Sequence, residues 1–316
     1  MRTTLQEQKI ISSFLIAIVA YGGFEIVAYI LNLNEPVLFI KAAFAIWLYL
    51  AFKITFLYDL HFKEPGALER SKKRHGAVSD RALRVISTAL SAVSDRFSHL
   101  LKKHHWAQFQ NYLILPGMLF WGTVILLYVD MGNTKLQQIL IFLSGSALVV
   151  NYWYLKEVFF RKTEKLDPDI FSGLGAVKIY VSAIIFAASL AIMRRFCLEH
   201  WYFLAAVFSL TYLLAHQALF QHRLVYLRSM GWVLLLSAMQ TLLAYFIYRY
   251  WGYNYFTAGV VMTAVYNLMW GTLHYHLDKA LTKKAFFEML LICLIVSAML
   301  ISVTNFKARL LDGCIF

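Results

Sequence analysis

Nine long apolar segments, each of roughly 20 residues, dominate this sequence and restrict it to a membrane fold. A helix of about 20 apolar residues crosses a hydrocarbon core of about 30 Å. Only 15% of the residues are charged, which is too few to cover the surface of a water-soluble domain. The nine segments are 11–31, 37–58, 111–129, 136–155, 174–193, 201–219, 231–248, 254–273 and 286–305.

The segments are predicted to be helices because they are continuously apolar, as in "LLLSAMQTLLAYFIY", without the alternation that marks barrel strands. We therefore predict an all-α polytopic transmembrane helix bundle of about nine spans. Residues 1–316 would form a single integral membrane domain. Lys178 in the fifth segment and Asn267 in the eighth make these the least secure spans, so eight spans is the alternative.

The basic residues predict an orientation for the bundle. The segments on the side of the N-terminus hold 21 of the 30 Lys and Arg residues, the segments on the other side hold 6, and 3 lie within spans. This positive-inside bias predicts a cytoplasmic N-terminus and an external C-terminus. The basicity is explained by topology, so no nucleic-acid partner is predicted. The bias suits a bacterial or archaeal cytoplasmic membrane.

The longest connection, residues 59–108, is predicted to be a basic cytoplasmic loop. From about residue 80 to 102, apolar residues recur every three or four positions, which indicates one amphipathic helix. This helix would lie in the membrane interface or pack on the cytoplasmic face of the bundle. Basic residues predicted to contact anionic lipid headgroups are Lys72, Lys73, Arg74, Arg81, Arg84, Lys102 and Lys103.

Polar residues within spans are costly in lipid and need a polar partner or cavity. Glu25 and Lys41 lie at similar depth on spans joined by the short turn "LNLNEP", so we expect them to form an ion pair. A second set lies in the cytoplasmic half of four spans. If these helices are neighbours, the set lines an inward-open pocket; otherwise each residue reaches water alone. The predicted pocket residues are Asn151, Lys178, His216, Asn267, His274 and Asp278.

The stretch "GTLHYHLDKALTKK", residues 271–284, contains two histidines that cannot share one ligand. On a helix, His274 and His276 diverge by about 200°, whereas His274 and Asp278 share a face. His274 is therefore the site candidate and His276 is expected at the interface. A metal centre would need His216, His274 and Asp278 from two helices, without an HxxxH or HExxH spacing. We predict no metal and no cofactor.

The three cysteines do not form a CxxC pair. Cys293 lies within the ninth segment, where it is expected to act as a small apolar residue. Cys197 and Cys314 both fall on the predicted external side, where an oxidising compartment would allow a disulfide. The sequence leaves that pairing open.

Three functions are compatible with these features, and the first is favoured. The protein would be a carrier or solute-binding permease with a cytoplasm-facing pocket for a small polar or anionic solute. It would alternatively be a non-catalytic membrane scaffold. Least favoured is an intramembrane enzyme acting on lipid or isoprenoid groups with His216 or His274 as acid or base, because no catalytic motif such as GxSxG occurs. The predicted partners are the bilayer and its anionic headgroups.

Overall fold

The computed structural model describes residues 2–33, 35–62, 103–130, 133–160, 168–221, 227–252 and 254–306. Within these ranges the chain forms nine helices, and the predicted all-helical bundle is confirmed. The helices are α1 (Arg2–Asn32), α2 (Pro36–Phe62), α5 (Lys103–Val129), α6 (Thr134–Phe160), α7 (Pro168–Phe196), α8 (His200–Gln221), α9 (Leu227–Tyr250), α10 (Tyr255–Leu277) and α11 (Lys283–Val303).

The protein is a multi-pass membrane protein. Eight of the described helices, α2 and α5 to α11, are long and apolar enough to cross a membrane, and α1 contains a shorter apolar stretch, Ile16–Asn32. Lys178 and Asn267 do not interrupt α7 and α10. A helix satisfies its own backbone hydrogen bonds, so one polar side chain in a span does not change the secondary structure. It requires instead that this face of the helix lies against a polar partner or cavity rather than lipid.

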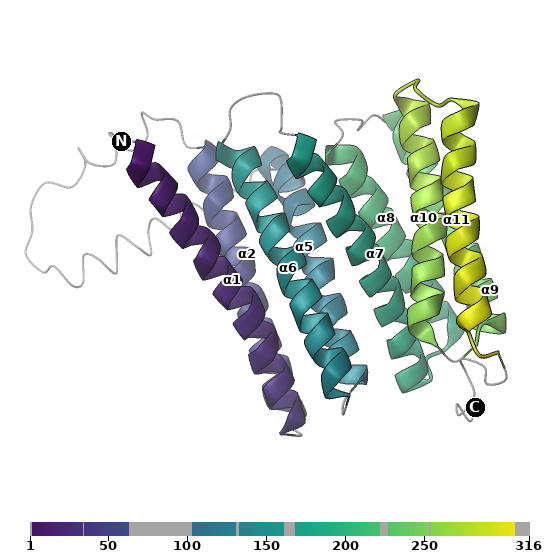
Figure 1. Cartoon of the computed structure of the whole chain (residues 1–316), viewed down its shortest axis with the longest axis horizontal. Helices are drawn as coiled ribbons and strands as arrows, with labels where there is room; N and C mark the ends of the chain where they lie inside the picture. The colour runs from purple at the N-terminus through teal and green to yellow at the C-terminus, as the bar shows by residue number, and fades with distance from the viewer. Residues whose placement is uncertain are drawn as a thin grey trace, which may run out of the picture.

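The helices alternate in direction, so that α1 begins and α11 ends at opposite ends of the bundle (Figure 1). We call the end at which α1 begins and α10 connects to α11 the basic end. The helix ends that flank the Lys- and Arg-rich connections predicted from the sequence all lie at this end. The other end is called the opposite end.

The predicted loop 59–108 is shorter than expected because α2 continues to Phe62 and α5 begins at Lys103. The sequence-predicted amphipathic helix at 80–102 lies outside the described residues. The proposed lipid contacts Lys72, Lys73, Arg74, Arg81, Arg84 and Lys102 also lie outside them, as does Cys314.

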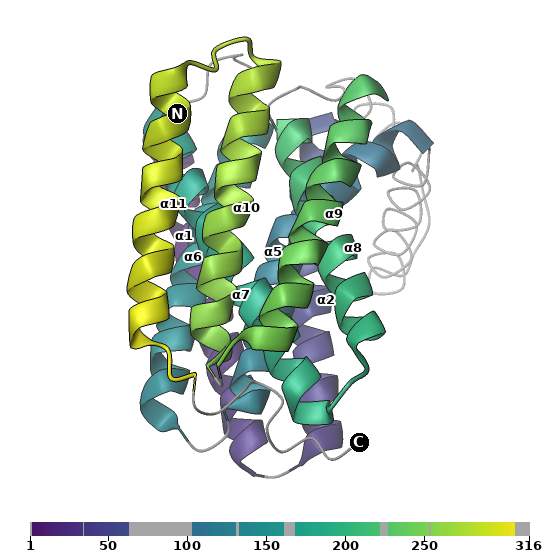
Figure 2. The same ribbon diagram turned by 90° about the vertical axis from the view of Figure 1, so that its right-hand side faces the viewer.

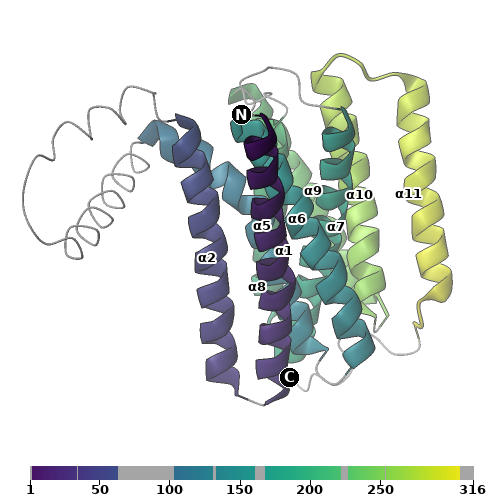
Figure 3. The ribbon, with the colours of Figure 1, turned by 60° about the vertical axis from the view of Figure 1, so that its left-hand side comes forward.

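The helices form two layers (Figures 1 and 2). One layer runs α1, α6, α7, α10, α11, and the other runs α2, α5, α8, α9, with each helix packing on its neighbours in that order. Helices α2 and α11 lie at opposite edges (Figure 3). The central helix α7 has 61% of its span buried, whereas α11 packs chiefly on α10 and has only 6% buried. The remaining surface of α11 is apolar and suited to lipid.

Buried hydrogen bonds join the central helices. The Thr123 hydroxyl on α5 donates to Ser144 Oγ on α6 at 2.8 Å, and Ser144 Oγ lies 2.9 Å from the Tyr180 hydroxyl on α7. Gln240 Nε2 on α9 donates to the Met262 carbonyl on α10 at 2.9 Å. Without a hydrophobic driving force between helices in lipid, such bonds and close packing hold the bundle together.

Helices α7 and α10 approach each other closely at Gly259. A Cβ atom at this position would lie 2.7 Å from the backbone nitrogen of Ala187 and 2.8 Å from its Cβ. Only glycine allows the two backbones to come this near. The two helices are therefore pressed together in the half of the bundle nearer the opposite end.

The residues at the two ends of α7 explain where this helix begins and ends. The helix begins at Pro168, a residue whose missing N–H is tolerated in the first turn. It ends with Cys197 in the left-handed region at φ 47°, where Leu198 N–H donates to the Met193 carbonyl at 3.0 Å. Helix α10 ends in the same way at Lys279, with φ 56° and a bond from Ala280 N–H to the Tyr275 carbonyl.

Candidate functional site

A cavity of about 230 Å³ lies between α7, α8 and α10. The helices supply both apolar walls and polar groups. The lining residues are Leu174, Gly175, Lys178, Ile179, Leu214, Gln217, Ala218, Tyr266, Asn267 and Trp270. The cavity is smaller than a typical drug-sized ligand site and has room for a solute of a few heavy atoms. We call it the Lys178 cavity.

The Lys178 cavity lies in the half of the bundle nearer the basic end. Lys178 is ten residues from the start of α7 and Asn267 is ten residues from the end of α10, so each is about 15 Å from its helix end. These two residues stand at the same level of the antiparallel pair. The contact between Ala187 and Gly259 lies nine residues, or about 13 Å, farther toward the opposite end. The same two helices are thus in close contact at one level and separated by a cavity at the other.

Lys178 is the principal charge of the cavity. It makes no hydrogen bond or ion pair with any residue that the structure describes. Beside it, Gly175 is a point of open space, because a Cβ there would meet no atom within 4 Å. A positively charged group that borders an open volume is chemically suited to attract an anionic or strongly polar group.

Two amides and two aromatic rings complete the lining. Gln217 on α8 is buried, and Asn267 donates from Nδ2 to the Thr263 carbonyl at 2.9 Å, which fixes the orientation of its side chain. Tyr266 is also buried, and its ring packs edge-on against Phe186 of α7 with centroids 6.1 Å apart. Trp270 completes the part of the wall that α10 supplies, one turn nearer the basic end than Tyr266.

The other sequence-predicted residues of α10 continue from this wall. The imidazole of His274 stacks parallel to the indole of Trp270, with centroids 5.8 Å apart. His274 Nδ1 lies 3.4 Å from Asp278 Oδ2, and Asp278 caps the end of α10. His276 points elsewhere: its ring packs against Trp232 of α9. The structure therefore separates the two histidines onto different sides of α10.

Asn151 and His216 do not line the Lys178 cavity. Asn151 borders a small cavity of about 20 Å³ between α1, α2, α5 and α6, with Pro116 among its neighbours, and its Nδ2 has no hydrogen-bond partner there. That volume fits a single water. His216 stacks on Tyr212, one turn earlier on α8. Of the six residues of the predicted pocket, only Lys178 and Asn267 line the Lys178 cavity, and the other four lie in three other surroundings.

Sequence reasoning missed Gln217, Tyr266 and Trp270. Gln217 follows His216 directly, and one step along a helix turns the side chain by about 100°. The sequence signal was a polar pair, "HQ", within a span, but the face that meets α7 and α10 was unknown. Tyr266 and Trp270 carried no signal, because aromatic residues within spans are common.

No group of three His, Cys, Asp or Glu side chains within the described ranges is arranged to hold a metal ion. His274 and Asp278 are neighbours, whereas His216 is not grouped with them.

Glu25 is exposed on α1, and it accepts a hydrogen bond from Gln138 Nε2 of α6 at 3.3 Å. No ion pair between Glu25 and Lys41 forms, although both residues are described. Helix α1 packs more extensively on α6 than on α2, which explains why the partner comes from α6.

A polar cluster lies at the opposite end of α5, α7 and α10. Tyr255 donates a hydrogen bond to Asp130 Oδ1, while Asp130 Oδ2 is buried without a hydrogen-bond donor in the described part of the chain. Burial raises the pKa of Asp130; the hydrogen bond from Tyr255 and the charge of Arg194 act against this shift. The cluster ties the ends of three helices together on the side away from the Lys178 cavity.

Cys197, which follows α7 at the opposite end, is disulfide-bonded, and Cys293 on α11 is buried and free. The pairing left open by the sequence, Cys197 with Cys314, involves a residue outside the described ranges.

Comparison of the chain with known protein families, curated proteins and solved structures gave no match.

Proposed function

We propose that this membrane protein is a carrier for a small anionic or polar solute, which binds in the Lys178 cavity. The observation that carries the proposal is the position of Lys178, a cation without an ionic partner among the described residues, on the wall of a cavity between three spans. A carboxylate or phosphate would supply the missing negative charge. The amides of Gln217 and Asn267 would then provide hydrogen bonds to it.

The packing of α7 and α10 supports alternating access. These helices separate around the cavity and close at Ala187 and Gly259, and the hydrogen bond from Tyr255 to Asp130 joins α10 to the end of α5 farther toward the opposite end. A carrier that opens toward one side of the membrane only would have such a closed contact on the other side of its binding cavity. From the distribution of basic residues we infer that the open side is cytoplasmic, in a bacterial or archaeal membrane.

The test uses a cysteine at Gly175, where open space accepts a side chain, in a protein with Cys293→Ala. Anionic and cationic methanethiosulfonate reagents are applied to each side of sealed vesicles. A carrier alternates, so we expect labelling from both sides, faster from the basic end. Lys178 should make the anionic reagent react about fivefold faster than the cationic one, which corresponds to roughly 1 kcal/mol of attraction.

The controls separate the cavity from the rest of the bundle. Gly22→Cys also enters open space but lies on α1, away from the cavity, and should not show the preference for the anionic reagent. Lys178→Gln should remove the preference at Gly175→Cys, whereas Lys41→Gln, at an exposed lysine, should keep it. Labelling of Gly175→Cys from one side only, or not at all, would contradict a carrier.

A further inference from the structure

A second recess, independent of the Lys178 cavity, lies on the outer surface of the bundle. It is a groove of about 410 Å³ that has α10 as its floor and α9 and α11 as its sides. Figure 2 shows these three helices side by side. We call it the lateral groove. Its lining residues are Trp232, Leu235, Leu236, Met239, Leu268, Met269, Thr272, Leu273, His276, Leu281 and Phe286.

The deep part of the lateral groove is apolar. The only hydroxyl in its wall, that of Thr272, already donates to the Leu268 carbonyl at 2.8 Å. Leu235 and Met239 on α9 are each about half exposed, so the groove opens sideways toward lipid. From Leu268 to His276 it follows α10 for about 12 Å. A narrow apolar groove of this kind suits a hydrocarbon chain.

The mouth of the groove lies at the basic end, at the level of the headgroups. There the rings of Trp232 and His276 pack edge-on with centroids 5.8 Å apart. Tryptophan gathers at the membrane interface, where one edge of its ring reaches water. Leu281, in the connection between α10 and α11, lines this part of the groove. The polar end of an occupant would therefore lie beside that connection.

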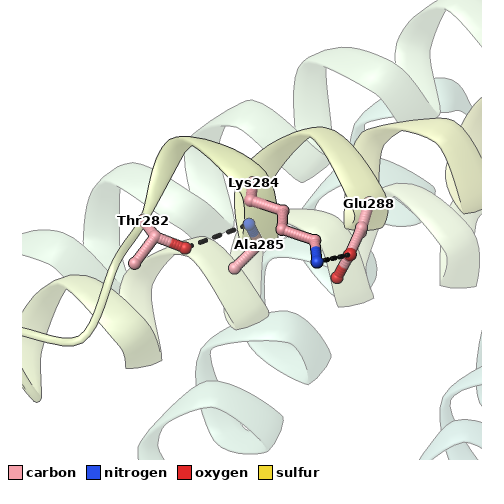
Figure 4. Close-up of polar contacts among 4 residues, drawn as sticks. All are labelled: Thr282, Lys284, Ala285 and Glu288. Atoms are coloured by element: carbon pink, nitrogen blue, oxygen red, sulfur yellow. Dashed lines mark hydrogen bonds and ion pairs between the residues drawn. The ribbon is translucent and has the colours of Figure 1, made fainter.

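Positive charge surrounds the mouth. The connection and the first turn of α11 contain the exposed residues Lys279, Lys283 and Lys284. Figure 4 shows that Thr282 caps α11 by accepting from Ala285 N–H at 3.1 Å, and that Lys284 pairs with Glu288 at 3.9 Å. The other acid nearby, Asp278, lies 3.4 Å from His274 on a different side of α10. Lys279 and Lys283 form no ion pair within the described ranges.

We propose that the lateral groove binds one anionic phospholipid of the surrounding bilayer. An acyl chain occupies the groove between α9 and α11, and the phosphate lies near His276, Lys279 and Lys283. The chain gains from burial against Leu236, Met239 and Leu273. The two lysines select an anionic headgroup over a zwitterionic one.

The experiment is native mass spectrometry of the delipidated full-length protein. It is titrated with phosphatidylglycerol or with phosphatidylcholine of the same acyl chains. We expect one tightly retained phosphatidylglycerol and an affinity at least fivefold above that for phosphatidylcholine. The double variant K279Q/K283Q should lose most of this preference, because each lysine near the headgroups contributes about fivefold. It should still bind both lipids.

A second variant tests the groove itself. Met239→Trp fills it and should abolish retention of both lipids, whereas Leu294→Trp, at an exposed position of α11 outside the groove, should behave as wild type. Unchanged lipid binding in Met239→Trp would overturn the proposal. A headgroup preference unaffected by K279Q/K283Q would also overturn it. A third outcome would also overturn it: the wild-type protein is a dimer, and Met239→Trp makes it a monomer without changing lipid binding. The groove would then be an interface between two copies of the protein.

Discussion

The indole of Trp270 and the imidazole of His274 lie parallel, within 3°, one helical turn apart on α10. Trp270 is in the wall of the Lys178 cavity, and His274 is followed by Asp278 at the end of the helix. The three side chains connect the cavity to the basic end along one face of α10. A solute that moved Trp270 would change the surroundings of His274.

The stacked pair should be energetically coupled. In a double-mutant cycle of Trp270→Leu and His274→Ala, we expect a coupling free energy of about 0.5–1.5 kcal/mol, the range for aromatic pairs. It is measured from reversible unfolding in mixed detergent micelles. The same cycle on Trp232 and His276, which meet edge-on at the same centroid distance, is the comparison. Strict additivity at Trp270 and His274 would show that the stacking contributes nothing.

Gly259→Ala should destabilise the bundle by about 1–3 kcal/mol, because the new methyl group would overlap the backbone of Ala187. The free energy of unfolding in micelles measures this. The control is Gly22→Ala, which adds the same methyl group where no atom lies within 4 Å. That substitution should stabilise the protein by about 0.5–1 kcal/mol through the entropy of the backbone. Equal effects at the two glycines would contradict the close approach of α7 and α10.

Lys279→Gly should raise the free energy of unfolding by about 1 kcal/mol. Lys279 occupies the left-handed region after α10, where a side chain is strained and glycine is preferred. Lys283→Gly is the matched control, because Lys283 begins α11 with helical geometry and glycine there is unfavourable. A loss of stability in Lys279→Gly would show that the connection adopts another conformation.

Asp130→Asn should alter how stability depends on pH. Burial raises the pKa of Asp130 in the folded protein, so the folded state favours the protonated carboxyl. As the pH rises through the ordinary carboxyl pKa toward the raised value, wild type should lose stability relative to Asp130→Asn. Below both values the difference should be constant. The measurement is the free energy of unfolding of both proteins across this pH range. If wild type gained stability relative to Asp130→Asn as the pH rose, the pKa of Asp130 would be lowered rather than raised.

Cys197 should resist alkylation until the protein is reduced, because it is disulfide-bonded. Peptide mapping after maleimide treatment of the denatured protein should find Cys293 labelled without reduction and Cys197 labelled only after it. If the basic end faces the cytoplasm, as the sequence predicts, this end of α7 faces the side on which an oxidising compartment would allow the disulfide to persist. Labelling of Cys197 without reduction would remove this support for the orientation.

The helices were predictable because hydrocarbon permits few alternatives for an apolar segment of 20 residues. The depth of each polar residue was predictable for the same reason. Its neighbours were not, since depth says nothing about which helices are adjacent. Asn151 and Lys178 both lie in the half nearer the basic end, yet Asn151 is on α6, which packs on α1 and α5, while Lys178 faces α8 and α10.

The positions of charged residues in the sequence were likewise informative about topology and uninformative about side-chain contacts. Glu25 and Lys41 are at similar depth on consecutive helices, but α1 turns Glu25 toward Gln138 of α6. The choice depends on how two helices rotate about their axes. That rotation is set by many small packing contacts, such as the ring of Tyr21 against Gly145. Such contacts cannot be predicted by pairing charged residues in the sequence.

The sparse packing of α11 bears on how the protein is assembled. It is the most apolar of the eight candidate spans and has the fewest neighbours in the bundle. Such a segment enters the bilayer through its own partitioning, whereas α7, with a lysine within its span, packs on both the earlier helix α5 and the later helix α10. The last helix would therefore integrate without waiting for the others, whereas the Lys178 face of α7 would be covered only after α8 and α10 have been inserted.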